Sequence, residues 1–98
     1  MACVASTEPL AGFDPGRRYG LHPQVAIRPE PFGALAYHYG NRRLTFLRSA
    51  DLVDLVRSLE EHPSVAEAYD RAAVPADRRP ALTRALAALE RAEVIRAC

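Results

Sequence analysis

Residues 37–47 read YHYGNRRLTFL and contain two short alternating runs on either side of Gly40-Asn41. This arrangement predicts a β-hairpin with a two-residue type II′ turn, because glycine supplies the positive φ that the first turn position needs. The turn fixes a register in which Tyr39 lies opposite Arg42, Tyr37 opposite Leu44, and Leu35 opposite Phe46. Leu35, Tyr37, Leu44 and Phe46 then share one face of the hairpin, and we expect Leu44 to be buried.

The outer edge of the second hairpin strand, Arg43 to Leu47, has no evident neighbour, because no later segment has the pattern of a strand. Unpaired strand edges invite association with other chains, so proteins usually cover them or use them. In the predicted turn, Tyr39 and Arg42 form a hydrogen-bonded pair, and bonded pairs recur at every second residue. The backbone groups of Arg43, Thr45 and Leu47 should therefore point outward.

An additional strand is predicted before the hairpin. Leu21, Pro23, Val25 and Ile27 alternate with polar or small residues, which is typical of a strand with one buried face. The segment PEPFG, residues 29–33, follows as a turn.

Three helices are predicted after the hairpin. Ser49 caps the first, which carries Leu52, Leu55, Val56 and Leu59 at helical spacing. Ser64 and Glu67 form a capping box for the second, and Asp77 caps a third that runs to Arg91. The order of elements predicts an α+β, winged-helix-like domain: a three-stranded antiparallel sheet followed by three helices.

The rest of the chain limits its class. Residues 1–18 contain Pro9, Pro15, Gly12 and Gly16 without periodicity, so we expect a flexible N-terminal tail before a domain at 19–98. The net charge of +1 gives no electrostatic footprint for nucleic acid, and no apolar run is long enough for a membrane span. Cys3 and Cys98 lack metal-ligand spacing. We expect a cytoplasmic protein with reduced cysteines and without a metal or cofactor.

Catalytic motifs are absent from the sequence. It has no phosphate-binding glycine loop, paired catalytic carboxylates or nucleophile elbow. We interpret His38 as a solvent-face strand residue, since an active site needs several convergent groups. An enzyme is therefore not expected, and two binding classes remain open. A winged helix could read DNA with residues 77–91 as its recognition helix, or the open strand edge could accept an extended peptide.

The run LHPQVAIRPEPFGALAYHYGNRRLTFL with SADLVDLVRSLEEHPSV after it resembles the peptide chaperones of mycofactocin biosynthesis. More distantly, the order of elements resembles the D-type peptide chaperone of pyrroloquinoline quinone synthesis. The resemblance covers about Tyr19 to Arg96. It implies a non-catalytic element that binds the leader of a ribosomally made precursor peptide and presents it to a radical S-adenosylmethionine maturase.

The resemblance also implies where the peptide binds, namely in a cleft between the third strand and the third helix. One wall would be the strand edge and the other the exposed flank of the helix. Relatives often close this helix with glycine, whereas this chain has Ala92-Glu93, which leaves the course of its last residues open. The implied peptide-binding residues are Arg43, Leu44, Thr45, Phe46, Leu47, Leu82, Thr83, Leu86, Ala87 and Glu90.

Overall fold

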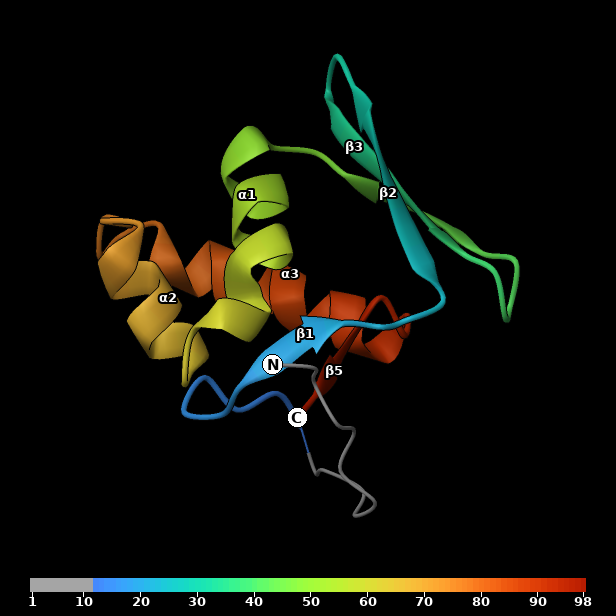
Figure 1. The fold of residues 1–98 in the computed structure, drawn as a ribbon. Helices are drawn as coiled ribbons and strands as arrows, with labels where there is room; N and C mark the ends of the chain where they lie inside the picture. The colour runs from blue at the N-terminus through green and yellow to red at the C-terminus, as the bar shows by residue number, and fades with distance from the viewer. Residues whose placement is uncertain (1–11) are drawn as a thin grey trace.

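The computed structural model describes residues 12–98 and confirms the α+β fold (Figure 1). Three helices follow an antiparallel sheet, and one helical turn, η1, extends the first of them. A second, smaller sheet joins the two ends of this part of the chain. The elements in order are β1 (Tyr19–Leu21), β2 (Val25–Glu30), β3 (Gly33–His38), β4 (Leu44–Leu47), α1 (Ala50–Ser58), η1 (Leu59–Glu61), α2 (Val65–Arg71), α3 (Arg79–Arg91) and β5 (Ile95–Ala97).

The larger sheet has the strand order β2-β3-β4. The predicted hairpin register is confirmed, since Tyr37 pairs with Leu44 and Leu35 pairs with Phe46. Gly33 begins β3 with a φ of 146°, and a Cβ at this position would collide with the carbonyl oxygen of Leu47. Only glycine therefore lets the turn between β2 and β3 approach the end of β4 so closely.

The predicted two-residue turn is wrong, because β3 and β4 are joined by a loop of four residues. The N–H of His38 donates to the Arg43 oxygen at 3.0 Å, and the Arg42 N–H donates to the His38 oxygen at 2.7 Å. Arg42 takes a φ of 61°. His38 and Arg43 thus close the ladder, and bonded pairs recur from there at every second residue. Ala36–Thr45 and Ala34–Leu47 are the next bonded pairs. The residues of β4 whose backbone groups point outward are therefore the opposite set from the predicted one.

The buried face of this sheet is also the opposite of the expected one. Ala34, Ala36, His38 and Leu47 are buried, whereas the Leu44 side chain is 59% exposed and Phe46 is 54% exposed. The alanines present little bulk, so α1 can pack closely against β3 and β4. The larger apolar residues are left on the outer face.

A second sheet, which the sequence patterns did not reveal, pairs β1 with β5 in antiparallel fashion. The predicted first strand is therefore split: Leu21 ends β1, and β2 begins at Val25. Gln24 lies in the tight turn between them, where its N–H donates to His22 Nδ1 at 3.0 Å. Leu21 pairs with Ile95, so the last residues of the chain pass alongside the first strand.

The hydrophobic core lies among the helices, the inner face of the larger sheet and the β1–β5 pair. Each helix contributes one apolar stripe at the spacing that the sequence predicts, and the leucines of α3 are among the most buried residues. The capping box of α2 is half confirmed, because Ser64 Oγ accepts from the Glu67 N–H at 3.1 Å. The buried residues contributed by the helices are Leu52, Val53, Leu55, Val56, Val65, Ala68, Tyr69, Leu82, Leu86 and Leu89.

Part of the segment assigned to the N-terminal tail belongs to the folded unit. Phe13 stacks on Tyr19 with ring centroids 4.6 Å apart. The Asp14 N–H donates to the Tyr19 hydroxyl at 2.9 Å, and the Arg17 oxygen accepts from the Val65 N–H at 3.1 Å. Residues 1–11 lie outside the described part.

The structure shows the course of the chain after Ala92-Glu93, where relatives often have glycine. Glu93 takes a φ of 62°, the left-handed conformation that glycine adopts without strain. The Val94 N–H donates back to the Leu89 oxygen at 2.9 Å, and the chain then turns directly into β5. The chain thus keeps the turn that a glycine would make, at the cost of a side chain in the left-handed region.

The C-terminus lies beside the start of β1. The Cys98 N–H donates to the Arg18 oxygen at 2.9 Å, which continues the β1–β5 pairing. Cys98 is disulfide-bonded, so the expected reduced state is wrong for this residue; Cys3 lies outside the described residues. Between residues 12 and 98, no helix has the length and apolar character needed to cross a bilayer.

Candidate functional site

The outer edge of β4 is unpaired within the described chain, because β3 is its neighbour on one side and no described strand lies on the other. Because the loop has four residues, Thr45 and Leu47 direct their backbone groups toward β3. Leu44 and Phe46 direct theirs toward the open side. The edge predicted from the sequence therefore exists, but the residues that present it are the alternate set.

The other edge of this sheet is much poorer in free donors. The β2–β3 ladder places Val25, Ile27 and Pro29 with their backbone groups outward, because Tyr39 N–H donates to the Gln24 oxygen at 2.7 Å. Pro29 has no N–H, and the Val25 N–H already donates to the His22 oxygen at 2.9 Å. An added strand would find a series of donors and acceptors on β4 but not on β2.

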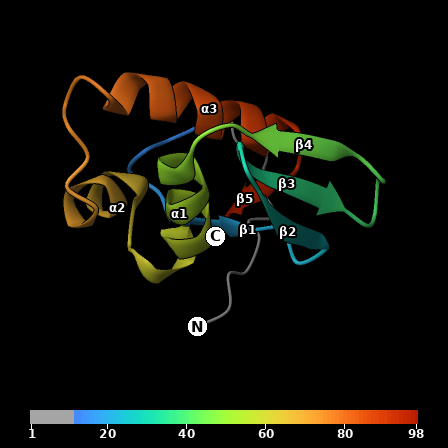
Figure 2. The same cartoon turned by 90° about the horizontal axis from the view of Figure 1, so that it is seen from above.

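In the view of Figure 2, α3 passes near the end of β4. Two polar ties join the elements, one at each end of β4. Before the strand, Asn41 Nδ2 donates to Glu93 Oε2 at 3.3 Å. After it, Arg78 Nη2 donates to Ser49 Oγ at 3.4 Å. α3 has 13 residues and is therefore about 20 Å long, and the two ties lie at its two ends.

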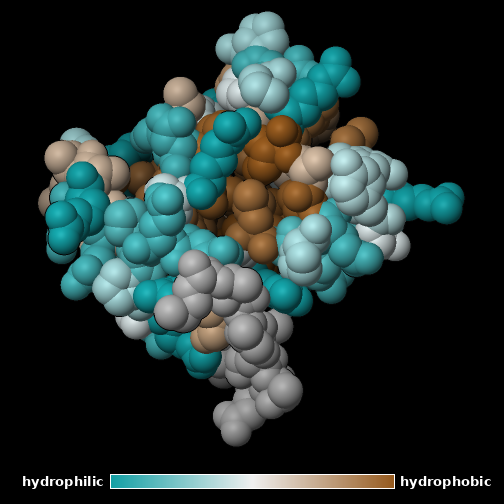
Figure 3. Space-filling model, in the orientation of Figure 1, coloured by the Kyte–Doolittle hydropathy of each residue, from teal (hydrophilic) through white to brown (hydrophobic). Residues whose placement is uncertain are grey.

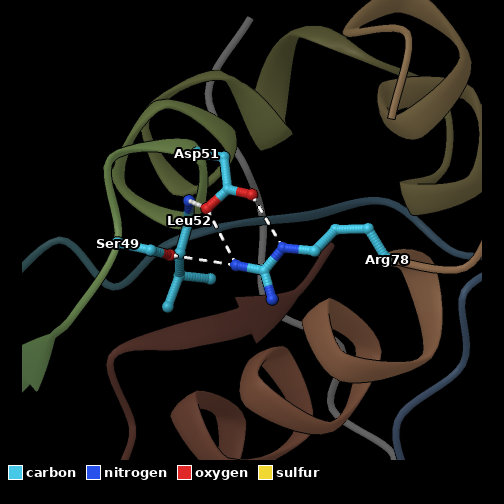
Figure 4. Close-up of polar contacts among 4 residues, drawn as sticks. All are labelled: Ser49, Asp51, Leu52 and Arg78. Carbon is cyan, nitrogen blue, oxygen red and sulfur yellow. Dashed lines mark hydrogen bonds and ion pairs between the residues drawn. The ribbon is translucent and has the colours of Figure 1, made fainter. Parts of the chain in front are cut away.

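The Arg78 tie is the stronger of the two and is shown in Figure 4. Arg78 Nε and Nη2 donate to the two carboxylate oxygens of Asp51 at 2.9 and 3.1 Å. The Leu52 N–H also donates to Asp51 at 2.8 Å. Hydrogen bonding from Arg78 is the main reason that the pKa of Asp51 is lowered to about 2. This bidentate pair fixes the start of α3 against the start of α1.

The loop that leads into β4 is held by His38, which the sequence analysis assigned to the solvent face. That interpretation is wrong, because His38 is 5% exposed. Its Nδ1 accepts from the N–H groups of Gly40 and Asn41 at 3.0 and 3.1 Å. The ring of His22 lies 4.4 Å away, centroid to centroid. Burial is the main cause of the lowered pKa of His22, and the nearby His38 is the second cause.

The predicted residues of β4 fall into three groups. Arg43, Leu44 and Phe46 are exposed. Thr45 is half-buried, and Leu47 is fully buried in the core. On α3, Leu82 and Leu86 are likewise buried. These three leucines are part of the hydrophobic core.

The remaining predicted residues of α3 are Thr83, Ala87 and Glu90, which are half-buried and share one flank of the helix. The hydroxyls of Thr83 and Tyr69 are hydrogen-bonded at 2.7 Å, which directs this flank toward α2. The Glu90 carboxylate lies near the buried Tyr19 phenol and contributes, after burial itself, to its raised pKa. Thr83 is thus bonded to α2, and the charge of Glu90 acts on Tyr19 of β1.

The front of the molecule carries a separate apolar hollow. Figure 3 shows hydrophobic residues gathered between α1 and the larger sheet, with polar residues around them. Leu21, Val25 and Ile27 are partly buried and pack against the core.

A known protein family matches most of the chain. Residues 18–96 match the model of the peptide chaperone MftB family. The chain belongs to this family. The matched range contains all three helices and the larger sheet with the open edge of β4, and it ends within β5.

Three curated relatives illustrate the family. All are named peptide chaperone MftB. The protein from Mycobacterium ulcerans is 55% identical over 62 residues, which are 63% of this chain and 57% of the relative. That from Mycolicibacterium smegmatis is 43% identical over 83 residues, 85% of this chain and 81% of the relative. That from Mycobacterium tuberculosis is 50% identical over 62 residues, with 63% and 57% coverage. No solved structure matches the chain.

Proposed function

We propose that the chain is a non-catalytic peptide chaperone of mycofactocin biosynthesis. It binds the leader region of the ribosomally made precursor peptide as an added strand on β4 and delivers the precursor to a radical S-adenosylmethionine maturase. The observation that carries this proposal is the open edge of β4, which is tied to α3 at both ends. The family membership and the names of the relatives support the same role.

The geometry suits a peptide of varied sequence. The backbone groups of Leu44 and Phe46 supply hydrogen bonds that any peptide strand can satisfy, and in strand addition the alternate side chains of the peptide supply specificity. The segments before and after the edge are tied to the ends of α3 through Asn41 and Ser49, so we expect little ordering of the protein on binding.

The α3 wall of the groove is inferred from the contacts of the opposite flank. Thr83 is hydrogen-bonded to Tyr69 of α2, and the charge of Glu90 acts on Tyr19 of β1. The flank on the other side of the leucine stripe carries Ala85 and Ala92, which are partly buried. We therefore assign the peptide-facing wall to Ala85 and Ala92. Their small side chains leave room for the side chains of a bound peptide.

The DNA-binding alternative is less well supported by these contacts. Among the arginines that a recognition helix at 77–91 would offer to phosphates, Arg78 is paired with Asp51 at 2.9 Å and Arg79 with Asp70 at 3.0 Å. Leu82, Leu86 and Leu89 face the core. Base reading requires polar side chains on an exposed helix face, and α3 offers few of them.

The test is a titration of fluorescently labelled precursor peptide into two variants, Ala85→Glu and Ala87→Glu. The two alanines are both half-buried and lie on opposite flanks of α3, so each variant is the matched control for the other. Ala85→Glu should weaken peptide binding at least tenfold, whereas Ala87→Glu should bind normally, with thermal melts confirming that both fold. The reverse pattern would place the peptide on the other flank, and an absence of binding by the unaltered protein would refute the function.

A further inference from the structure

The outer face of the larger sheet carries an apolar surface that the peptide groove does not use. The strand registers place its residues in two rows across the sheet. Arg28, Leu35 and Phe46 form one row, and Ala26, Tyr37 and Leu44 form the other. We call these six residues the outer face.

This outer face is uncovered among the described residues. Figure 1 shows the sheet edge-on, with the helices and the β1–β5 pair on its other side. Leu44 and Phe46 are more than half exposed, at 59% and 54%. A monomer rarely exposes a contiguous apolar patch of this kind unless the patch serves an interaction.

Aromatic residues at both ends of the outer face extend it. Phe32 packs on Phe46 with centroids 5.7 Å apart, and Tyr39 packs edge-on against Tyr37 at 5.1 Å. Phe32, Phe46 and Arg48 line a shallow hollow. Exposed aromatic side chains beside a hollow are typical anchors of protein interfaces.

The charged residues around the outer face are mostly basic. The Arg48 guanidinium lies 5.6 Å from the centre of the Phe46 ring. Arg28 is bonded to Glu30 at 3.2 Å but has a side chain that is 79% exposed. Arg42 and Arg43 are exposed at the hairpin tip. These arginines form a basic rim around the outer face. The rim complements a surface that carries carboxylates.

The outer face is continuous with the peptide groove. Leu44 and Phe46 point their side chains to the outer face and their backbone groups to the open edge. A peptide strand added to β4 would extend the sheet, and alternate side chains of that peptide would lie on the same face. An occupant of the outer face would thus touch the protein and its bound peptide together.

We propose that the outer face is the docking surface for a protein partner that presents an apolar centre flanked by acidic residues. This inference rests on the proposed function, under which the partner is the maturase that acts on the bound peptide. A second copy of this chain is a poorer occupant, because two arginine-rimmed faces would meet with Glu30 as the acidic member of each. Like charges at an interface suppress the wrong pairing.

The experiment uses the full chain, the labelled precursor peptide and the purified maturase. One variant, Phe32→Ser, removes an exposed aromatic from the hollow without altering β4. A second, Arg28→Glu with Arg48→Glu, reverses the rim. Its matched control is Arg71→Glu with Arg84→Glu, which makes the same change in charge at two exposed arginines of α2 and α3.

We expect both outer-face variants to bind the peptide within threefold of the unaltered protein and to lose at least tenfold in affinity for the maturase. The rim variant should also lose most of the salt dependence of maturase association. The control variant should match the unaltered protein in both titrations. Thermal melts of all variants establish that each is folded.

Other results would overturn the inference. Unchanged maturase affinity in both folded outer-face variants would refute it while leaving the peptide site intact. Sedimentation that shows a dimer of the unaltered protein, split by Phe32→Ser, would assign the face to a second copy. Loss of binding to vesicles of phosphatidylcholine and phosphatidylglycerol in the variants would assign it to lipid. Failure of the unaltered protein to bind either peptide or maturase would instead refute the proposed function.

Discussion

Inward-pointing and outward-pointing backbone groups alternate along β4, so proline should have opposite effects at two adjacent residues. The Thr45 N–H bonds inward to β3, whereas the Leu44 N–H points to the open edge, as the His38–Arg43 pair at 3.0 Å requires. Proline removes the N–H at its own position and leaves neighbouring bonds intact. Thr45→Pro should therefore damage the fold, and Leu44→Pro should damage peptide binding.

The sizes of the two effects can be estimated from hydrogen-bond energies. Thr45→Pro leaves the Ala36 oxygen unsatisfied beneath a half-buried strand, at a cost of about 1–3 kcal/mol. In a domain of this size that cost lowers the melting temperature by roughly 5–20 °C. The side chain of Leu44 is 59% exposed, so Leu44→Pro should change stability by only about 0.5 kcal/mol. It should weaken peptide binding between about 2-fold and 150-fold, corresponding to about 0.5–3 kcal/mol for one lost donor.

The assay combines thermal melts with titration of labelled precursor peptide. Leu44→Ala serves as the control, because it removes the same side chain and keeps the N–H. It should bind the peptide more tightly than Leu44→Pro does. The reasoning is refuted if Leu44→Pro unfolds while Thr45→Pro stays folded and loses the peptide. That result would mean that the Thr45 N–H points outward, as a two-residue turn would require. If both proline variants fold and bind normally, β4 is not the site.

Three further predictions concern the elements that hold the groove. Asp51→Asn should destabilise the protein by about 0.5–1 kcal/mol at pH 7, a modest figure because the ion pair with Arg78 is solvent-exposed. Since the pKa of Asp51 is depressed from 3.8 to about 2, this contribution is fully present above pH 4 and shrinks as the pH falls through 2. Urea denaturation at pH 7, 4, 3 and 2 checks this, and a difference as large at pH 2 as at pH 7 would contradict it. Glu93→Gly should raise the free energy of unfolding by about 1 kcal/mol by relieving the left-handed residue at φ 62°, and a lower melting temperature would mean that the Asn41 contact matters more. Tyr69→Phe should cost about 0.5–1.5 kcal/mol through its lost bond to Thr83, with unchanged peptide affinity; weakened binding without loss of stability would place this flank of α3 in the groove.

The hairpin shows how far the sequence alone determines the candidate site. Pairing of Tyr37 with Leu44 follows from either loop length, because a two-residue turn at Gly40-Asn41 and a four-residue loop after His38 give the same opposite partners. The two loops differ in which backbone groups point outward. That choice depends on acceptors supplied by side chains: His38 Nδ1 for two loop N–H groups, and Asn41 Oδ1 for the Arg43 N–H at 2.9 Å.

The choice of buried face was likewise undecided by the hairpin sequence. Both faces of β3 are apolar, with Ala34 and Ala36 on one and Leu35 and Tyr37 on the other. A ranking by size selects the larger pair for the core, but the close approach of α1 requires the smaller pair there. This is a property of packing between elements, and a strand's own pattern does not contain it.

The apolar stripes of the helices, the cap at Ser64 and the open edge of β4 followed from the sequence because each depends on residues close together in the chain. The pairing of Tyr19–Leu21 with Ile95–Ala97 did not, because two three-residue strands at opposite ends of the domain carry almost no local signal. The same holds for the ties from Asn41 to Glu93 and from Ser49 to Arg78. They place α3 along β4, and only the folded chain brings these residues together.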